Sequence, residues 1–382
     1  MKTFKNKFIF YTFFLASIFI LSTQVSSAPI PKAPNIDVSS YILIDYDSGM
    51  VIASKNPDLV LPPASITKIM TSYLAFTELH NKTLGLHDEV LISKNAWQTG
   101  GSKMFIEVGK KIKVQELLHG IITTSGNDAS VAMAEHISGN EETFAIYMNQ
   151  MADSLGMHNT NYANSTGLPN ESLYTTARDI SILARALIKN FPIEYKLYSQ
   201  KEYVFNDIKQ YSRNKLLYLD DSVDGIKTGF TKKAGYCLAT SAKRGSRRLI
   251  SIVLGAKSPD QRTKASKSLL EYGFRFYETH KLFSSNQELT QARVFSGDKD
   301  YISLGVKDSS YITIPRRQIK NVKKKFIIDQ NLTAPVSENE AIGYVAIELE
   351  GKTITTFKLF AMEPVSEGSF YRKTLDSIYR YF

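Results

Sequence analysis

The pattern of hydrophobic residues changes near residue 280, and this change constrains the fold more than any other feature of the chain. Before it, apolar residues recur at i, i+3, i+4 and i+7 in several segments, the spacing of amphipathic helices. Between residues 281 and 364, only short, alternating runs separated by turn residues are present. The sequence therefore predicts a mixed α/β domain over residues 29–280 and a small, all-β, sandwich-like domain over residues 281–364.

The first domain is expected to begin with two strands, continue with helices and return to a strand hairpin. Its predicted strands cover residues 41–45, 50–54, 236–240 and 249–255. Its predicted helices cover residues 64–74, 114–122, 129–136 and 179–188. The second domain is expected to have strands at residues 301–304, 311–314, 325–328, 341–348 and 353–359. The only cysteine, Cys237, lies in an apolar strand-like run, so we expect a buried small hydrophobe.

The first 28 residues have the features of a secretory signal peptide. Three lysines precede an apolar run over residues 8–21, and Ser26 and Ala28 supply the small residues that a signal peptidase reads. A transmembrane anchor would instead need about 20 apolar residues. We therefore predict export and cleavage after Ala28.

The formal net charge is +10, and residues 1–28 contribute +3 of it. An exported basic protein without a nucleic-acid motif is expected to meet anionic lipid or cell-wall polymer, and we predict no nucleic-acid partner. A basic run at residues 316–325 is interpreted as a solvated strand edge rather than a surface that faces the membrane or the wall.

Three short polar patterns follow one another along the first domain. They are an S-x-x-K pattern at residues 65–68, an S-x-N pattern at 125–127 and a K-T-G pattern at 227–229. The first two patterns also recur, at residues 212–215 and 138–140.

Context separates the copies. Ser65 opens a strongly apolar helix, where i, i+3 spacing places a serine hydroxyl and a lysine amine on one face. Ser125 lies in the break between two apolar helices. Ser212 opens no apolar period and is expected in a polar loop, and Gly139 is expected to end a helix.

These residue types suit nucleophilic catalysis. A serine hydroxyl needs a base, and an amine can serve when burial or a nearby cation lowers its pKa. Proximity of Lys68 and Lys227 would lower both pKa values. Ser125 could relay a proton to a leaving amine, and Asn127 could hold a peptide carbonyl.

The third pattern suits recognition of a carboxylate. Lys227 offers a cation, Thr228 a hydroxyl, and Gly229 would let a strand approach the ligand closely. A chance assembly of a helix cap, a loop and a turn could also produce three such patterns, but their order and context argue against it.

Residues 63–71, 125–129 and 224–229 resemble the motifs of the low-molecular-mass penicillin-binding proteins, the serine D-alanyl-D-alanine carboxypeptidases of peptidase family S11. The likeness covers nearly all of the mature chain and implies a β-lactamase/transpeptidase-like fold. It implies that Ser65 carries the acyl group, Lys68 accepts its proton and Ser125 is the third catalytic residue.

The same resemblance implies the substrate contacts. Lys227 would bind substrate, and the backbone N–H groups of Ser65 and Phe230 would form the oxyanion hole. Arg213 and Arg248 align with arginines that lie around the site in this family.

The activity implied is removal of the terminal D-alanine from peptidoglycan stem peptides, with inhibition by β-lactam antibiotics and without metal or cofactor. Phe230 replaces a histidine that relatives with this tail often carry, which leaves a DD-endopeptidase as an alternative.

A class A β-lactamase and a non-catalytic envelope-interaction protein are rival interpretations of the same patterns. The β-lactamase needs a general-base glutamate, and neither Glu171 nor Glu194 has E-x-x-L-N surroundings. The non-catalytic protein would not need the intact polar patterns. The six histidines lack metal-ligand spacing, so no metal site is predicted.

Residues 365–382 predict an amphipathic helix. Its apolar face contains Tyr371, Leu375, Ile378, Tyr379 and Phe382, and its polar face contains Arg372, Lys373, Asp376 and Arg380. The segment is too short and too charged to span a bilayer but suits the plane of the interface. The family resemblance implies peripheral attachment to the periplasmic face of the inner membrane. A helix packed on the protein's own surface would show the same pattern.

Overall fold

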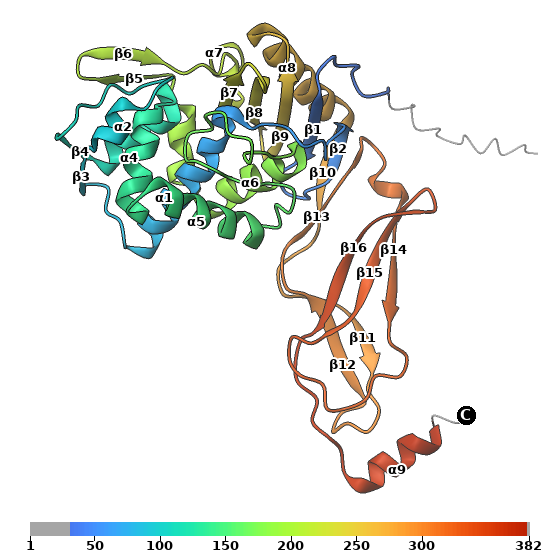
Figure 1. Cartoon of the computed structure of the whole chain (residues 1–382). Helices are drawn as coiled ribbons and strands as arrows, with labels where there is room; N and C mark the ends of the chain where they lie inside the picture. The colour runs from blue at the N-terminus through green and yellow to red at the C-terminus, as the bar shows by residue number, and fades with distance from the viewer. Residues whose placement is uncertain (1–30, 380–382) are drawn as a thin grey trace, which may run out of the picture.

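The structure is a computed structural model that describes residues 31–379 (Figure 1). It has an α/β domain, an all-β domain and a C-terminal helix, which confirms the predicted fold class. The predicted signal peptide, residues 1–28, lies outside the described residues.

A five-stranded antiparallel sheet with the order β2-β1-β9-β8-β7 forms the centre of the first domain. The four strands predicted in this domain are all present in it. The bounds are β1 Ser40–Asp45, β2 Val51–Lys55, β7 Val223–Thr231, β8 Gly235–Arg244 and β9 Arg247–Ala256.

Strand β9 explains how both faces of the sheet are covered. Ile250 and Ile252 face one hydrophobic core, while Leu249 and Val253 alternate with them and face another. Helices α1 (Lys68–Asn81), α3 (Val114–His119), α4 (Asn127–Ser138), α5 (Glu141–Ser154) and α6 (Ala177–Asn190) build the first core. Helix α8 (Pro259–Phe276) and the short α7 (Leu216–Leu219) cover the second. Cys237 is buried, as predicted.

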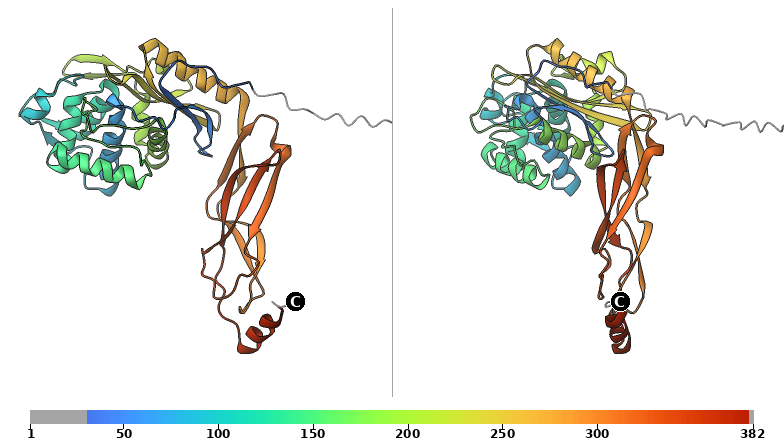
Figure 2. Two further views of the ribbon diagram at one scale, coloured as in Figure 1. Left: turned by 45° about the vertical axis from the view of Figure 1, so that its right-hand side comes forward. Right: turned by 90° about the vertical axis from the view of Figure 1, so that its right-hand side faces the viewer.

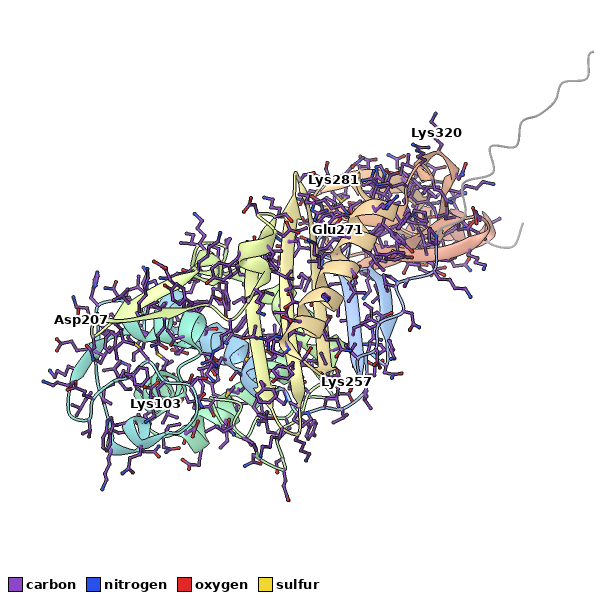
Figure 3. All side chains as sticks on the ribbon, turned by 90° about the horizontal axis from the view of Figure 1, so that it is seen from above. Lys103, Asp207, Lys257, Glu271, Lys281 and Lys320 are labelled. Carbon is purple, nitrogen blue, oxygen red and sulfur yellow. The ribbon has the colours of Figure 1, made fainter. Side chains whose placement is uncertain are left out.

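Short elements complete this domain. They are η1 (Ala64–Thr67), α2 (Lys94–Gln98), the π-type turn η2 (Gly120–Thr124), η3 (Glu194–Ser199), and the hairpins β3 (Glu89–Leu91) with β4 (Lys111–Lys113) and β5 (Glu202–Phe205) with β6 (Ile208–Tyr211). Seen from above, Lys103 and Asp207 lie at the end of the domain farthest from Lys320 of the β domain (Figure 3).

The second domain is a five-stranded antiparallel sheet with the order β11-β12-β16-β15-β14, together with the pair β10-β13. Strand β10 runs across the predicted boundary at residue 280. The bounds are β10 Tyr277–Phe283, β11 Gln287–Arg293, β12 Tyr301–Val306, β13 Ser310–Pro315, η4 Ile319–Asn321, β14 Val322–Ile328, β15 Ala341–Leu349 and β16 Lys352–Ala361. Strand β14, which carries exposed Lys323, Lys324 and Lys325, is an edge strand as the interpretation of the basic run requires.

Polar contacts link the two domains around Asp45, a fully buried carboxylate at the end of β1. Asp45 accepts hydrogen bonds from the backbone N–H of Ser48 at 3.0 Å and from the hydroxyl of Thr279 on β10, and it pairs with Arg247 at 3.3 Å. From this junction the β domain extends away from the α/β domain, and the C-terminal helix lies at its far end (Figures 1 and 2).

Helix α9 (Phe370–Tyr379) follows the β domain and agrees with the predicted terminal helix. Its polar face contacts the β domain: Asp376 is buried and accepts a hydrogen bond from the backbone N–H of Ser296 at 2.6 Å, and Arg372 pairs with Asp300. Tyr371 and Ile378 of the opposite face are 73% and 53% exposed. Within residues 31–379, no helix is both long enough and apolar enough to cross a bilayer.

Candidate active site

Ser65 and Lys68 lie where the chain enters the core helix of the first domain. Ser65 belongs to η1, and Lys68 is the first residue of α1, so one turn of helix separates them. The Lys68 Nζ atom lies 3.2 Å from the Ser65 Oγ atom. This confirms that the i, i+3 spacing brings amine and hydroxyl together.

Lys68 is almost completely buried, and its amine contacts three oxygens. Besides Ser65 Oγ, the Nζ atom donates to Asn127 Oδ1 and to the backbone carbonyl of Thr166, both at 2.6 Å. Burial lowers the pKa of Lys68 to about 7, and the positive charge of Arg213 contributes to this lowering. The amine is therefore available as a base near neutral pH.

Ser125 and Asn127 lie at the turn between η2 and α4. Ser125 has a left-handed conformation, with φ of 62°, and this conformation ends η2. Asn127 opens α4 and also donates from Nδ2 to the carbonyl of Gly100 at 2.6 Å. The second S-x-N pattern is structural, because Gly139 ends α4 with φ of 80°.

Lys227, Thr228 and Gly229 lie in β7, which faces η1 across the site. A Cβ atom at Gly229 would lie 3.1 Å from the carbonyl oxygen of Pro63 and 3.2 Å from the backbone nitrogen of Ile66. Glycine therefore allows β7 to approach the backbone on both sides of Ser65, in addition to any ligand. Lys227 is buried, and its pKa is well below the usual range because of burial and the neighbouring Lys68 charge.

The elements that carry these residues surround a cleft of about 700 Å³, although Lys68 and Lys227 are buried and do not belong to its lining. Its lining contains Ser65, Ser125, Asn127, Thr228, Gly229, Phe230 and Arg213 from the sequence predictions. Phe230 is half-exposed, and its ring stacks on Tyr236 with 4.2 Å between the centroids. Arg213 donates to the hydroxyl of Ser102 at 2.6 Å, and its positive charge lowers the pKa of both buried lysines. It lies in the polar loop expected around Ser212.

Arg248 does not line this cleft. Its guanidinium makes a bidentate pair with Asp224, with the Nη2 atom 2.6 Å and the Nη1 atom 2.7 Å from the carboxylate oxygens, and also contacts Ser241. The structure brings Arg262 to the cleft instead. Arg262 lies in the first turn of α8 and donates to the carbonyl of Gly229 at 3.2 Å.

Sequence reasoning missed Arg262 because its local signal concerns only the helix. Ser258 caps α8 and Pro259 is its first residue, which predicts where the helix begins. Only the packing of α8 on β8 and β9 brings the arginine to the site. Thr166 was missed for a related reason, since it contributes a backbone carbonyl that no sequence pattern reports. Within residues 31–379, no cluster of three His, Cys, Asp or Glu side chains could hold a metal ion.

Comparison with known proteins agrees with this geometry. Residues 27–258 match the D-alanyl-D-alanine carboxypeptidase family model of peptidase family S11, and residues 277–367 match the C-terminal domain of penicillin-binding protein 5. The D-alanyl-D-alanine carboxypeptidase DacA of Escherichia coli K12 is 42% identical over 358 residues, which cover 91% of this chain and 89% of the relative.

Solved structures are similar to most or part of this chain. The structure of penicillin-binding protein 5 from Haemophilus influenzae superposes with a TM-score of 0.86 at 40% identity, covering 88% of this chain and all of that chain. Penicillin-binding protein D2 from Listeria monocytogenes, solved with bound ampicillin, has a TM-score of 0.58 at 30% identity and covers 63% of this chain and all of that chain. The chain thus belongs to the serine D-alanyl-D-alanine carboxypeptidases, peptidase family S11, and is an enzyme of peptidoglycan metabolism.

Proposed function

We propose that this enzyme removes the terminal D-alanine of peptidoglycan stem peptides through an acyl-enzyme on Ser65. The observation that carries the proposal is the contact between the Ser65 hydroxyl and the buried, readily deprotonated amine of Lys68. A serine with such a neighbour meets the requirement for an activated nucleophile.

In the acylation step, Lys68 Nζ takes the proton of Ser65 as the Oγ atom attacks the carbonyl carbon of the penultimate D-alanine. The resulting oxyanion would be held by the backbone N–H groups of Ser65 and Phe230, which the close approach of β7 to η1 supports. The C–N bond then breaks, Ser125 relays a proton to the leaving amine, and free D-alanine departs. Water hydrolyses the ester and restores Ser65.

Substrate contacts follow from the positions of the remaining residues. Asn127 orients the peptide, while Thr228 on β7 and Arg213 in the neighbouring loop, both in the cleft lining, bind the terminal carboxylate together with buried Lys227. Phe230 contributes an apolar side chain to the cleft. A histidine at this position would contribute a side chain that can titrate. β-Lactams would acylate the same serine, in keeping with the ampicillin-bound relative.

We also propose that the mature chain works at the periplasmic face of the inner membrane. The signal-like residues 1–28 support export. Helix α9 supports peripheral attachment, because its polar face is bonded to the β domain and its apolar side chains are exposed. In this arrangement the catalytic unit, residues 29–280, is separated from the lipid by the β domain, residues 281–364.

Peptide mapping of a penicillin adduct tests the nucleophile. We expect a single adduct on Ser65 and neither labelling nor peptidase activity in Ser65→Ala. An adduct on Ser125 or Ser212 would falsify the assignment.

Product analysis separates the two peptidase reactions. We expect release of D-alanine from a pentapeptide, and the release should persist in EDTA. Cleavage of a cross-linked dimer without cleavage of the pentapeptide would support the endopeptidase reaction that Phe230 leaves open.

A further inference from the structure

The six residues 195–200 contact all three elements that carry the catalytic patterns, although none of them lines the cleft. They form most of η3 and the residue after it. Tyr195 and Tyr198 are buried, with 4% and 2% of their surface exposed. Buried tyrosines with polar partners fix the relative positions of the elements they join.

The contact with α1 ends at the backbone of the catalytic lysine. The Tyr198 hydroxyl lies 2.5 Å from the Ser72 Oγ atom, and Ser72 is itself completely buried. The Ser72 hydroxyl donates to the carbonyl of Lys68 at 2.8 Å. Tyr198 therefore acts as donor to Ser72 and is one hydrogen bond away from the Lys68 backbone.

The contact with β7 lies three residues before Lys227. The Tyr195 hydroxyl donates to the Asp224 carboxylate at 3.0 Å, and the Arg248 guanidinium holds the same carboxylate. A Cβ atom at Gly225 would lie 2.6 Å from the Tyr195 hydroxyl, so the strand meets this side chain at contact distance. The two tyrosine rings stack with their centroids 5.6 Å apart, which joins the α1 contact to the β7 contact.

The contact with η2 lies two residues before Ser125. Gln200 Oε1 accepts from the Thr123 hydroxyl at 3.2 Å and lies 2.6 Å from His119 Nδ1. Lys68, Ser125 and Lys227 are far apart in sequence, and their elements meet on this one short segment.

We propose that Tyr195, Tyr198 and Gln200 are positioning residues that hold α1, β7 and η2 in the arrangement needed for acylation. Arg248 belongs to the same group, since it fixes Asp224 rather than contacting substrate. The proposal rests on acylation at Ser65 and adds the residues that keep its partners in place. Active-site groups must be held within about 0.5 Å of their productive positions, so loss of one contact should reduce the rate of the chemical step.

The test uses Tyr198→Phe, Ser72→Ala and Tyr195→Phe in the otherwise intact enzyme, with stopped-flow acylation by a fluorescent penicillin. We expect the maximal acylation rate to fall about 10- to 100-fold while the dissociation constant of the encounter complex stays close to that of the wild type. The double variant Ser72→Ala with Tyr198→Phe should be no slower than the slower single variant, because both remove one shared contact.

Tyr73→Phe is the matched control. Tyr73 is a buried residue of α1, and its hydroxyl accepts from Asn190 at 2.8 Å, so it joins α1 to α6, which carries no catalytic pattern. It should lower the melting temperature as much as Tyr198→Phe and leave the acylation rate unchanged.

Wild-type rates in all three test variants, or an equal loss of rate in Tyr73→Phe, would overturn the positioning role. Additive losses in the double variant would overturn the link from Tyr198 through Ser72. Absence of any labelling in the wild-type enzyme, or labelling that survives Ser65→Ala, would instead overturn the proposed function.

Discussion

The burial of the Lys68 amine is unfavourable for the stability of the fold but favourable for catalysis. Burying an ammonium group is unfavourable, and here the cost appears as a pKa lowered to about 7, from burial first and from Arg213 second. The three oxygen atoms around Nζ fix the amine in place. The neutral form then has both a suitable position and a suitable basicity.

This environment predicts the pH dependence of acylation. Only the neutral amine can accept the Ser65 proton, so the rate should rise with pH, reach half its maximum near pH 7 and become constant above about pH 8. Below the pKa it should fall about tenfold per pH unit. The second-order rate constant for a penicillin without a titratable side chain, measured from pH 5 to 9, checks this; a flat profile would contradict it.

Lys68→Arg removes the base while it keeps the positive charge. Arginine stays protonated at any usable pH, so we expect a folded protein that loses most of its acylation. Rapid-quench labelling measures the loss, and circular dichroism serves as the control for folding. Acylation near the wild-type rate would mean that Lys68 is not the base.

At the scale of single residues, the sequence predicts those site residues that belong to a short pattern along the chain. Five residues are predictable in this way and meet in space: Ser65, Lys68, Ser125, Asn127 and Lys227. Arg248 is expected at the cleft, but the salt bridge with Asp224 holds it elsewhere. Arg262 is not expected there, because the packing of a helix against strands far away in sequence decides which arginine reaches the site.

At the scale of elements, the close approach of β7 and η1 places the nucleophile Ser65 next to the strand that carries the K-T-G residues. Gly229→Ala should disturb it, because the new Cβ atom would press on the backbone beside Ser65. We expect a loss of about 1–3 kcal/mol in the free energy of unfolding, typical of overpacking. Acylation should fall about 100-fold, which is more than the stability change alone explains.

Urea denaturation and penicillin labelling of the same Gly229→Ala preparation would measure both quantities. Labelling at the wild-type rate would show that the approach of β7 does not set the geometry of the site.

The elements themselves are predictable where local periodicity is strong. The helices that begin at Lys68, Val114, Asn127 and Ala177 and the hairpin β8-β9 follow their predicted segments. Helices α5 and α8 are not among the predicted segments. Polar residues interrupt the buried face of α8, whereas α5 buries Phe144, Met148 and Ala152 at helical spacing and was predictable from them. The caps Asn140 and Ser258 mark where the two helices begin.

At the scale of the whole molecule, the β domain lies between the catalytic domain and α9 (Figure 1). Truncation after Ser369, which keeps the buried core residue Val365, should therefore leave hydrolysis of small peptides unchanged, because Asp376 and Arg372 of α9 contact Ser296 and Asp300 of the β domain. The full mature chain should sediment with vesicles that contain anionic lipid, and the truncated chain should not.

The variant Tyr371→Ser with Ile378→Ser is a control for that experiment, since it keeps the polar contacts of α9 and removes exposed apolar surface. It should sediment like the truncated chain. Retention of the intact chain in the soluble fraction, or unfolding of the catalytic domain on truncation, would contradict attachment through α9.

The single cysteine has a practical consequence for studying this molecule. Cys237 is buried in β8, and burial raises its thiol pKa to about 11, so it should remain silent toward maleimide dyes. A cysteine introduced at exposed Lys325 would then be the only reactive thiol in the native enzyme. With a fluorescent penicillin on Ser65 as the second dye, the efficiency of energy transfer would report the distance between the cleft and the β domain. In the native wild-type enzyme, buried Cys237 therefore gives no maleimide signal, and Ser65 binds the second dye.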